Sequence, residues 1–211
     1  MKIFENVHLV DGTTANVYLV LHEGKVALID AGLPGEHEKV LEYLKELGFA
    51  PEDVDLIIAT HGHHDHIGSL KALKELTGAN VAAHREEVPY ITGKKSFRWS
   101  SPPVEVDIPL EDGDKIAGLK VIHSPGHTPG SIVLYSEELG AIFPGDLVHE
   151  ENGKLREIPH EYSMNPKMNR EAIRNISKLN FKHVLPSHGN PILNEGKLRW
   201  NELIDEFSES P

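Results

Sequence analysis

The sequence predicts a layered α/β fold, and three observations lead to this prediction. Short apolar segments of the kind found in buried strands recur along the whole chain, and amphipathic helical segments lie between them. Clusters of polar residues follow directly after several of the strands. Strand ends are rigid while the loops after them can vary, so such clusters are typical of functional sites on α/β scaffolds.

The first half of the chain begins with strands and then alternates between strands and helices. His22-Glu23-Gly24-Lys25 separates two apolar segments and predicts a hairpin turn. Apolar side chains from Val40 to Leu47 fall on one stripe of a helix that Gly48 would end. We predict strands within residues 3–10, 16–22, 25–30, 55–60, 80–84 and 104–110, and helices over 36–48 and 69–78.

The second half continues with apolar segments typical of strands and closes with helices. Its last strand is expected to run into a loop that contains the motif PSHG. We predict strands within residues 119–124, 131–136, 141–146 and 183–189, and helices over 171–179 and 197–207. With 211 residues and no visible linker, residues 1–211 are expected to form a single catalytic domain.

Composition and charge exclude several classes of function. The chain has 39% hydrophobic and 26% charged residues, as expected of a globular protein, and no apolar segment approaches the length of a membrane span. Its net charge of -12 argues against a nucleic-acid partner. The N-terminus lacks the pattern of a signal peptide, so we expect a cytoplasmic protein without a membrane partner. Because the chain has no cysteine, imidazole and carboxylate groups must hold any metal.

The segment HGHHDH, residues 61–66, is the strongest functional signal in the sequence. It follows a predicted buried strand, and nothing about folding requires so many polar side chains there. His61 and His63 are two positions apart and can turn toward one point. Asp65 and His66 follow where a helix is expected to begin, and the side chain of His64 should point away from this centre.

Three further metal-ligand candidates lie in loops downstream. His127 stands in PGHTPG, Asp146 in FPGD and His188 in PSHG, each beside glycine, which lets the backbone approach closely. Three imidazoles form the ligand set of a catalytic zinc ion with an open position. We therefore predict two divalent ions, with zinc as the expected metal and manganese or iron as alternatives. The expected sets are His61, His63 and His127 for the first ion, Asp65, His66 and His188 for the second, and Asp146 as a bridge.

Most of the other histidines are expected to be ordinary structural residues. The chain has 14 histidines, and a lone histidine usually binds no metal. We assign structural or surface roles to His8, His22, His37, His160 and His183.

The motifs together make the chain resemble the metallo-β-lactamase fold superfamily, and within it the glyoxalase II-like hydrolases. The resemblance rests on Asp30 in LIDAG, on HGHHDH, on GHTPGS at 126–131, and on the segments that contain Asp146 and His188. It implies a four-layer αββα sandwich of two mixed β-sheets flanked by helices, with a binuclear site that uses the ligand sets given above. It also implies that Asp30 orders the loop bearing the ligands without binding metal itself.

Departures from other branches of this superfamily narrow the expected chemistry. Asp146 replaces the cysteine of thiolate-dependent lactamases, and His63 replaces the glutamate of the di-iron flavoprotein reductases. The segment after His188 is too short for the helical domain with which glyoxalase II enzymes bind glutathione, which puts a glutathione thioester in doubt. The tyrosine expected in related lactonases is absent, and His149 stands in that region as a candidate substitute.

The predicted function is hydrolysis of a small ester, thioester or lactone by a hydroxide that bridges two metal ions. Asp65 would orient this hydroxide and carry its proton to the leaving group, which makes it the predicted catalytic residue. A mononuclear iron oxygenase of the persulfide dioxygenase type is the alternative on the same fold, and a non-catalytic binding protein is a second alternative.

Two loops are candidates for contact with the small-molecule substrate. Residues 93–103 combine Lys94, Lys95 and Arg98 with two aromatic residues, a mixture that suits a small anionic acyl group. The simpler interpretation is a solvated connection, with Trp99 packed down as an anchor. Residues 149–163 form the other candidate wall. The sequence indicates neither the substrate's identity nor the oligomeric state.

Overall fold

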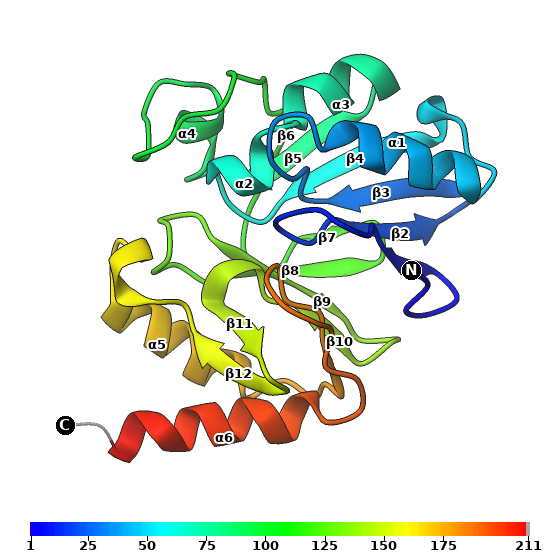
Figure 1. The fold of residues 1–211 in the computed structure, drawn as a ribbon. Helices are drawn as coiled ribbons and strands as arrows, with labels where there is room; N and C mark the ends of the chain where they lie inside the picture. The colour runs from blue at the N-terminus through cyan, green and yellow to red at the C-terminus, as the bar shows by residue number, and fades with distance from the viewer. Residues whose placement is uncertain (210–211) are drawn as a thin grey trace. The chain divides into compact units, whose positions relative to one another are not determined.

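The computed structural model describes residues 1–209, and the chain forms two compact units (Figure 1). Unit 1 comprises residues 1–110 and unit 2 comprises residues 111–211. Each unit contains a mixed β-sheet with helices packed on it, which confirms the α/β class predicted from the sequence. No helix within residues 1–209 has the length and apolar character needed to cross a membrane.

Unit 1 is built on a six-stranded sheet in which the strands follow one another in chain order. The first three strands are antiparallel, and the remaining neighbours are parallel. The strands are β1 (Val7–Leu9), β2 (Tyr18–His22), β3 (Lys25–Ile29), β4 (Val54–Ala59), β5 (Asn80–His84) and β6 (Ile108–Leu110). The helices are α1 (His37–Glu46), α2 (His64–Ile67), α3 (Leu70–Thr77) and α4 (Val88–Ile91), with a 3-10 turn, η1, at Pro51–Asp53.

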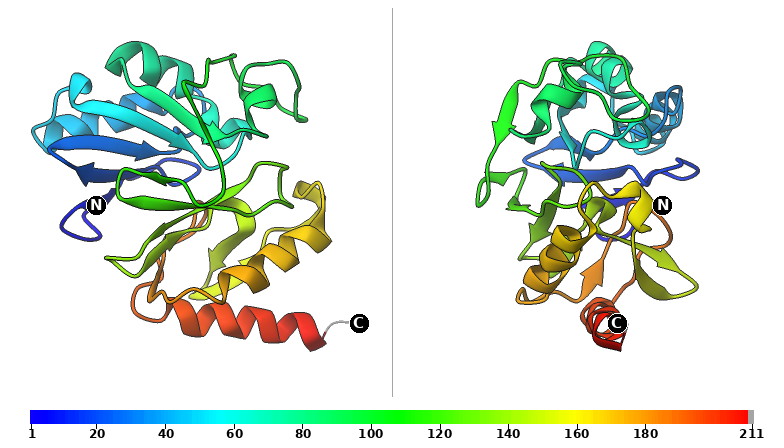
Figure 2. Two further views of the ribbon diagram at one scale, coloured as in Figure 1. Left: turned by 180° about the vertical axis from the view of Figure 1, so that it is seen from behind. Right: turned by 90° about the vertical axis from the view of Figure 1, so that its left-hand side faces the viewer.

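Helices α1 and α3 cover one face of this sheet, as Figures 1 and 2 show from opposite sides. Val40 and Leu44 of α1 and Leu70 and Leu73 of α3 are fully buried against alternate strand residues such as Leu28. Burying each such side chain contributes about 1.5–3 kcal/mol, so this apolar layer is what makes the sheet a rigid support.

Unit 2 is built on a five-stranded sheet of order β13-β10-β9-β8-β7. Only β10 and β13 pair in parallel within it. Its strands are β7 (Lys115–Ile116), β8 (Leu119–His123), β9 (Ile132–Ser136), β10 (Ala141–Phe143) and β13 (His183–Val184). A separate hairpin is formed by β11 (Val148–Glu151) and β12 (Lys154–Glu157), and the helices are α5 (Pro166–Ile176) and α6 (Gly196–Glu209). Two 3-10 turns, η2 (Gly145–Leu147) and η3 (His160–Tyr162), complete the unit.

The core of unit 2 lies between its sheet, the β11–β12 hairpin and helices α5 and α6 (Figure 2). Trp200 of α6 is fully buried there and donates its indole N–H to the carbonyl of Ile173 in α5 at 2.9 Å. Phe181 packs edge-on against the same indole with 5.5 Å between ring centroids. This contact ties both helices to the strands from which the ligand-bearing loops emerge.

Several element boundaries differ from those predicted. The hairpin β11–β12 was not predicted, and α5 begins at Pro166 instead of residue 171. Asn165 caps α5 by accepting a hydrogen bond from the Met168 N–H at 3.1 Å, and Pro166 needs no N–H partner at the first helical position. The strand predicted over 104–110 shortens to β6, because only its last residues pair with β5.

Candidate metal centre

Unit 1 brings four of the predicted metal-binding side chains together at the end of β4. The strand stops at Ala59, and the chain passes through His61 and His63 into the short helix α2, which contains Asp65 and His66. His61 and His66 are fully buried, whereas Asp65 keeps 23% of its side chain exposed. The site residues predicted in this segment therefore lie close to one another within one unit.

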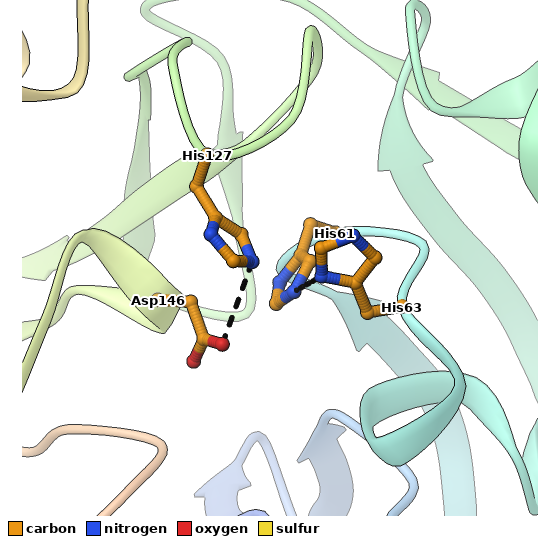
Figure 3. Close-up of side chains that lie close together, drawn as sticks. All are labelled: His61, His63, His127 and Asp146. Carbon is orange, nitrogen blue, oxygen red and sulfur yellow. Dashed lines mark hydrogen bonds and ion pairs between the residues drawn. The ribbon is translucent and has the colours of Figure 1, made fainter. Parts of the chain in front are cut away.

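The first pair of donors in unit 1 consists of two imidazole nitrogens. Nε2 of His61 lies 3.1 Å from Nδ1 of His63, and Figure 3 shows the two rings turned toward each other. Zinc–nitrogen bonds of 2.0–2.1 Å in a tetrahedral arrangement separate two ligand nitrogens by about 3.3 Å. The observed distance thus fits two ligands of one ion.

The second pair combines a carboxylate with an imidazole. Oδ2 of Asp65 lies 3.6 Å from Nε2 of His66. This separation also suits two ligands of one ion, and the added carboxylate makes the pair compatible with zinc, manganese or iron.

Asp30 orients His66 directly and His61 through Thr60. Its buried carboxylate accepts hydrogen bonds from the Thr60 N–H at 2.7 Å and from Nδ1 of His66 at 2.8 Å. The Thr60 hydroxyl also donates to Asp30, and it lies 3.1 Å from Nδ1 of His61. Because Nδ1 of His61 and Nδ1 of His66 are engaged in this way, Nε2 of each ring is left to bind a metal. Asp30 itself has a positive φ of 63°, which aspartate tolerates better than most residues.

Glu87 is a supporting residue that sequence reasoning missed. Its fully buried carboxylate accepts a hydrogen bond from the N–H of Gly62, the residue between His61 and His63, at 2.8 Å. A Cβ atom at position 62 would stand only 2.8 Å from that carboxylate and 3.1 Å from the ring of Phe97. Nothing near Glu87 in the sequence marks it as a partner of a loop 25 residues earlier, so no local signal could have identified it.

Unit 2 gathers the other three predicted ligands from separate loops. His127 lies between β8 and β9, Asp146 lies in the 3-10 turn η2 after β10, and His188 follows β13. Oδ2 of Asp146 is 3.5 Å from Nε2 of His127, a contact drawn in Figure 3, and Oδ1 is 3.5 Å from Nε2 of His188. Each oxygen of Asp146 therefore lies beside a different histidine.

Backbone contacts hold these loops in place. The carbonyls of Gly126 and His127 accept hydrogen bonds from Asn165 and Met164, at 2.8 and 3.0 Å. Gly126 has a φ of 144°, and a Cβ atom there would collide with the backbone of Asn169. This loop is consequently pinned against the N-terminal end of α5.

The loop of His188 is held by β11. The Glu150 N–H donates to the His188 carbonyl at 2.9 Å, and the Glu150 carboxylate accepts from the Asn190 N–H at 2.6 Å. Gly189 between them has a φ of 89°, and a Cβ atom there would collide with the Glu150 carbonyl. The glycine beside His188 is thus needed for both its backbone conformation and its close approach.

The side chains present fit the divalent ions that the sequence predicts. Each unit contains two pairs of donor atoms at ligand-to-ligand separations, and all the donors are imidazole nitrogens or carboxylate oxygens. Those donor types suit zinc, manganese or iron in the absence of thiolate.

His149 and His64 occupy different positions around these donors. His149 lies on β11 with its Nδ1 buried and without a hydrogen-bond partner among the described residues. Burial lowers the pKa of His149; Glu151 raises it, and His188 adds to the lowering, which favours a neutral imidazole. His64 turns instead toward Trp99, with 5.5 Å between ring centroids.

The histidines assigned structural roles contact ordinary partners. His8 bonds to the Tyr43 hydroxyl, His22 to Asp55 and His160 to Glu157, each at 3.0 to 3.1 Å. The Asn194 N–H donates to His183, and His37 contacts Ser69.

Comparison with known proteins relates the chain to one family. A family model described as the metallo-beta-lactamase superfamily matches residues 10–188 and so extends over both units. The chain is 33% identical over 166 residues to the acyl-coenzyme A thioesterase MBLAC2 of Gallus gallus, covering 66% of this chain and 59% of that protein. It is 33% identical over 151 residues to the uncharacterized protein YobT of Bacillus subtilis, covering 65% of this chain and 64% of YobT.

A solved structure extends the likeness to three dimensions. The protein TTHA1623, crystallised in a di-iron-bound form, superposes with a TM-score of 0.72 at 27% identity, over 91% of this chain and 96% of that one. The chain spans less than two thirds of the length of the two sequence relatives named above.

Proposed function

Because the chain belongs to the metallo-β-lactamase superfamily, we propose that it is a metal-dependent hydrolase of small esters, thioesters or lactones. The observation that carries this proposal is the presence of two donor pairs in each unit, all built from imidazole and carboxylate groups. Burying this many polar side chains costs folding free energy unless the groups have a binding partner.

We propose that residues 1–211 act as one catalytic domain, with the ligand sets that the family resemblance implies. His61, His63 and His127 would hold one ion, Asp65, His66 and His188 a second, and Asp146 would bridge them. We propose zinc as the metal, with manganese or iron as alternatives; the di-iron form of TTHA1623 supports keeping iron among them. When bound, divalent ions activate water and polarise an acyl carbonyl.

Asp65 is the proposed catalytic residue. It supplies the one carboxylate among the unit 1 donors, it is partly exposed, and one of its oxygens lies 3.6 Å from Nε2 of His66. Its other oxygen, Oδ1, lies 3.7 Å from Nδ1 of His64. Asp65 would take a proton from the attacking water and deliver it to the departing alcohol or thiol.

The thioester is the first substrate to test among the three classes. The likeness to MBLAC2, an acyl-coenzyme A thioesterase, supports it, and glyoxalase II-like chemistry is also thioester hydrolysis. The mononuclear oxygenase alternative is disfavoured because a single iron ion would not use Asp65, His66 and His188 as ligands. Yet Asp65 lies beside His66, and His188 beside Asp146, at distances that suit metal ligands.

A substrate panel on reconstituted protein tests the proposal. Thioesters, lactones, phosphodiesters and β-lactams are offered to protein loaded separately with zinc, manganese and iron, with chelator-treated protein as the blank. We expect metal-dependent hydrolysis of an acyl substrate and no oxygen uptake with a persulfide. Oxygen uptake by the iron form, without hydrolysis in any form, would establish the alternative instead.

A further inference from the structure

The loop of residues 93–103 is closed at its base and attached to the core of unit 1. It follows α4 (Figure 1). The Val104 N–H donates to the Ile91 carbonyl at 3.0 Å, and this hydrogen bond joins the two ends of the loop. Ile91 and Val104 both belong to the apolar core of unit 1. Within the loop, the Lys95 N–H donates to the Pro89 carbonyl at 2.8 Å. The loop is therefore a compact structure with a defined position in this unit.

Two aromatic residues of this loop contact the histidines of the HGHHDH segment. Phe97 stacks on Tyr90, with 4.1 Å between centroids and 8° between planes, and meets the ring of His63 edge-on at 4.5 Å. Trp99 lies over His64 at 5.5 Å. The loop consequently runs alongside the proposed metal ligands of unit 1.

The exposure of the two aromatic residues separates their roles. Phe97 is half-buried between Tyr90 and His63, so it serves as the anchor of the loop. Trp99 keeps 49% of its surface exposed. The expectation that Trp99 is packed down as an anchor is therefore wrong, and a large apolar surface stays available beside the ligand segment.

Arg98 gives this apolar surface a positive charge. Its guanidinium lies 4.8 Å from the centre of the Trp99 ring. Arg156 and Arg170 each pair with a carboxylate at 2.8 Å, whereas Arg98 pairs with no carboxylate anywhere in the described part of the chain. In a chain of net charge -12, an arginine left without a carboxylate is available for an anionic ligand.

We infer that Trp99 and Arg98 bind the acyl part of the substrate, and that this acyl group carries a negative charge at its far end. The indole packs on the methylene chain, and the guanidinium takes the terminal carboxylate through two N–H donors. This inference rests on the proposed function, since it concerns the substrate of that same site. Lys94 is exposed, and none of the ring contacts in the described part of the chain involves it.

Matched substrates test the inference by kinetics. The glutaryl and valeryl thioesters of N-acetylcysteamine have the same leaving group and the same number of acyl carbons, and they differ in the terminal carboxylate. We expect the wild type to favour the glutaryl thioester by about tenfold in kcat/KM, as for a hydrogen bond to a charged group. Arg98→Gln should abolish this preference by raising KM for the glutaryl thioester more than for the valeryl thioester.

Two further variants separate a specific contact from general charge and from the apolar surface. Lys94→Gln removes the same charge from the same loop and should keep the preference for the glutaryl thioester. Trp99→Ala should raise KM for both substrates. Equal losses in Lys94→Gln and Arg98→Gln, or no preference in the wild type, would overturn the inference.

Tryptophan fluorescence provides a readout that does not depend on turnover. The chain has two tryptophans, of which Trp200 is fully buried and Trp99 is exposed. Titration of metal-loaded protein with glutarate should change the emission of Trp99 at lower concentrations than valerate does, and Trp99→Phe should remove the signal. If no thioester is hydrolysed but glutarate still binds in this way, the proposed function fails and the binding site stands. If glutarate and valerate act alike, the binding site fails.

Discussion

The two units hold their proposed metal ligands by different means. In unit 1 the four ligands lie within the six-residue segment 61–66. Two buried carboxylates, those of Asp30 and Glu87, support this segment through side-chain hydrogen bonds. In unit 2 the ligands come from three separate loops, which are braced mainly by backbone hydrogen bonds and by Gly126 and Gly189.

This difference shows how the proposed ligands of each unit can be disturbed. A carboxylate that braces two histidines can be removed by an isosteric change without disturbing the fold around it. A glycine that braces a loop cannot be replaced without moving the backbone.

Replacing Asp65 with asparagine is expected to cause the largest loss of activity. Asparagine keeps one oxygen but loses the negative charge and the proton acceptor, so kcat should fall by about 10²- to 10⁴-fold. Thermal stability should change little when metal is in excess. Steady-state kinetics on the best thioester and a thermal melt measure the two effects.

His64→Ala is the control, since His64 neighbours Asp65 and has no assigned role as a ligand. Its kcat should stay near the wild-type value. Loss of turnover in His64→Ala, together with normal turnover in Asp65→Asn, would reverse the assignment of roles in the HGHHDH segment.

Asp30→Asn tests the carboxylate support of unit 1. An amide NH₂ would face Nδ1 of His66 or the Thr60 N–H, so metal affinity should fall by about 10- to 100-fold. The buried mismatch should also cost about 1–3 kcal/mol of stability. Competition with a chromophoric chelator measures the affinity.

Glu36→Gln provides the matched control for this effect. Glu36 is also a buried acceptor of backbone N–H groups in unit 1, from Thr14 and Leu33, but it contacts none of the ligands. The Glu36→Gln protein should be less stable than the wild type but should bind metal with the same affinity. Equal affinity losses in both variants would show that Asp30 acts only through the stability of the unit.

Gly189→Ala tests the backbone support of unit 2. The new Cβ atom would collide with the Glu150 carbonyl, so the His188 loop must move. One metal should then bind about tenfold or more weakly, as expected when a contact that supports a ligand is lost. Gly153→Ala also places alanine at a positive φ, 79°, but in open space, so it should cost about 1 kcal/mol and leave metal binding alone. Tight binding of both metals by Gly189→Ala would contradict the role given to this glycine.

The smallest expected effect concerns the pH dependence of unit 1. Burial acts to raise the pKa of Glu36, but hydrogen bonds from Leu33, Thr14 and Lys39 outweigh it and hold the pKa below the ordinary value of 4.5. The stability that the carboxylate contributes is therefore fully present above that value and is lost as the pH falls through the lowered pKa. The difference in Tm between wild type and Glu36→Gln, measured with chelator, should shrink below about pH 4. A difference that is constant with pH would contradict this account.

Much of the fold could be predicted from local sequence patterns. The hairpin at residues 22–25 formed as predicted: His22 pairs with Lys25, and Glu23 and Gly24 both have positive φ, as a tight two-residue turn requires. Strand β4 and the polar segment after it were predictable because a buried apolar strand and a dense histidine cluster are both local signals.

Other features depend on contacts that local patterns do not show. The hairpin β11–β12 has few apolar residues, and only its Asn152-Gly153 turn, with both φ values positive, carried a signal that could have been read. The support from Glu87 and the exposure of Trp99 come from tertiary packing, so the sequence alone could predict neither.

The metal stoichiometry tests most directly the proposal that the chain binds two ions. Elemental analysis of fully reconstituted protein after gel filtration, alongside a calorimetric titration, counts the ions bound per chain. We expect saturation at two ions in the wild type and at one in a variant that lacks Asp65 and His66. Saturation of the wild type at one ion would contradict it.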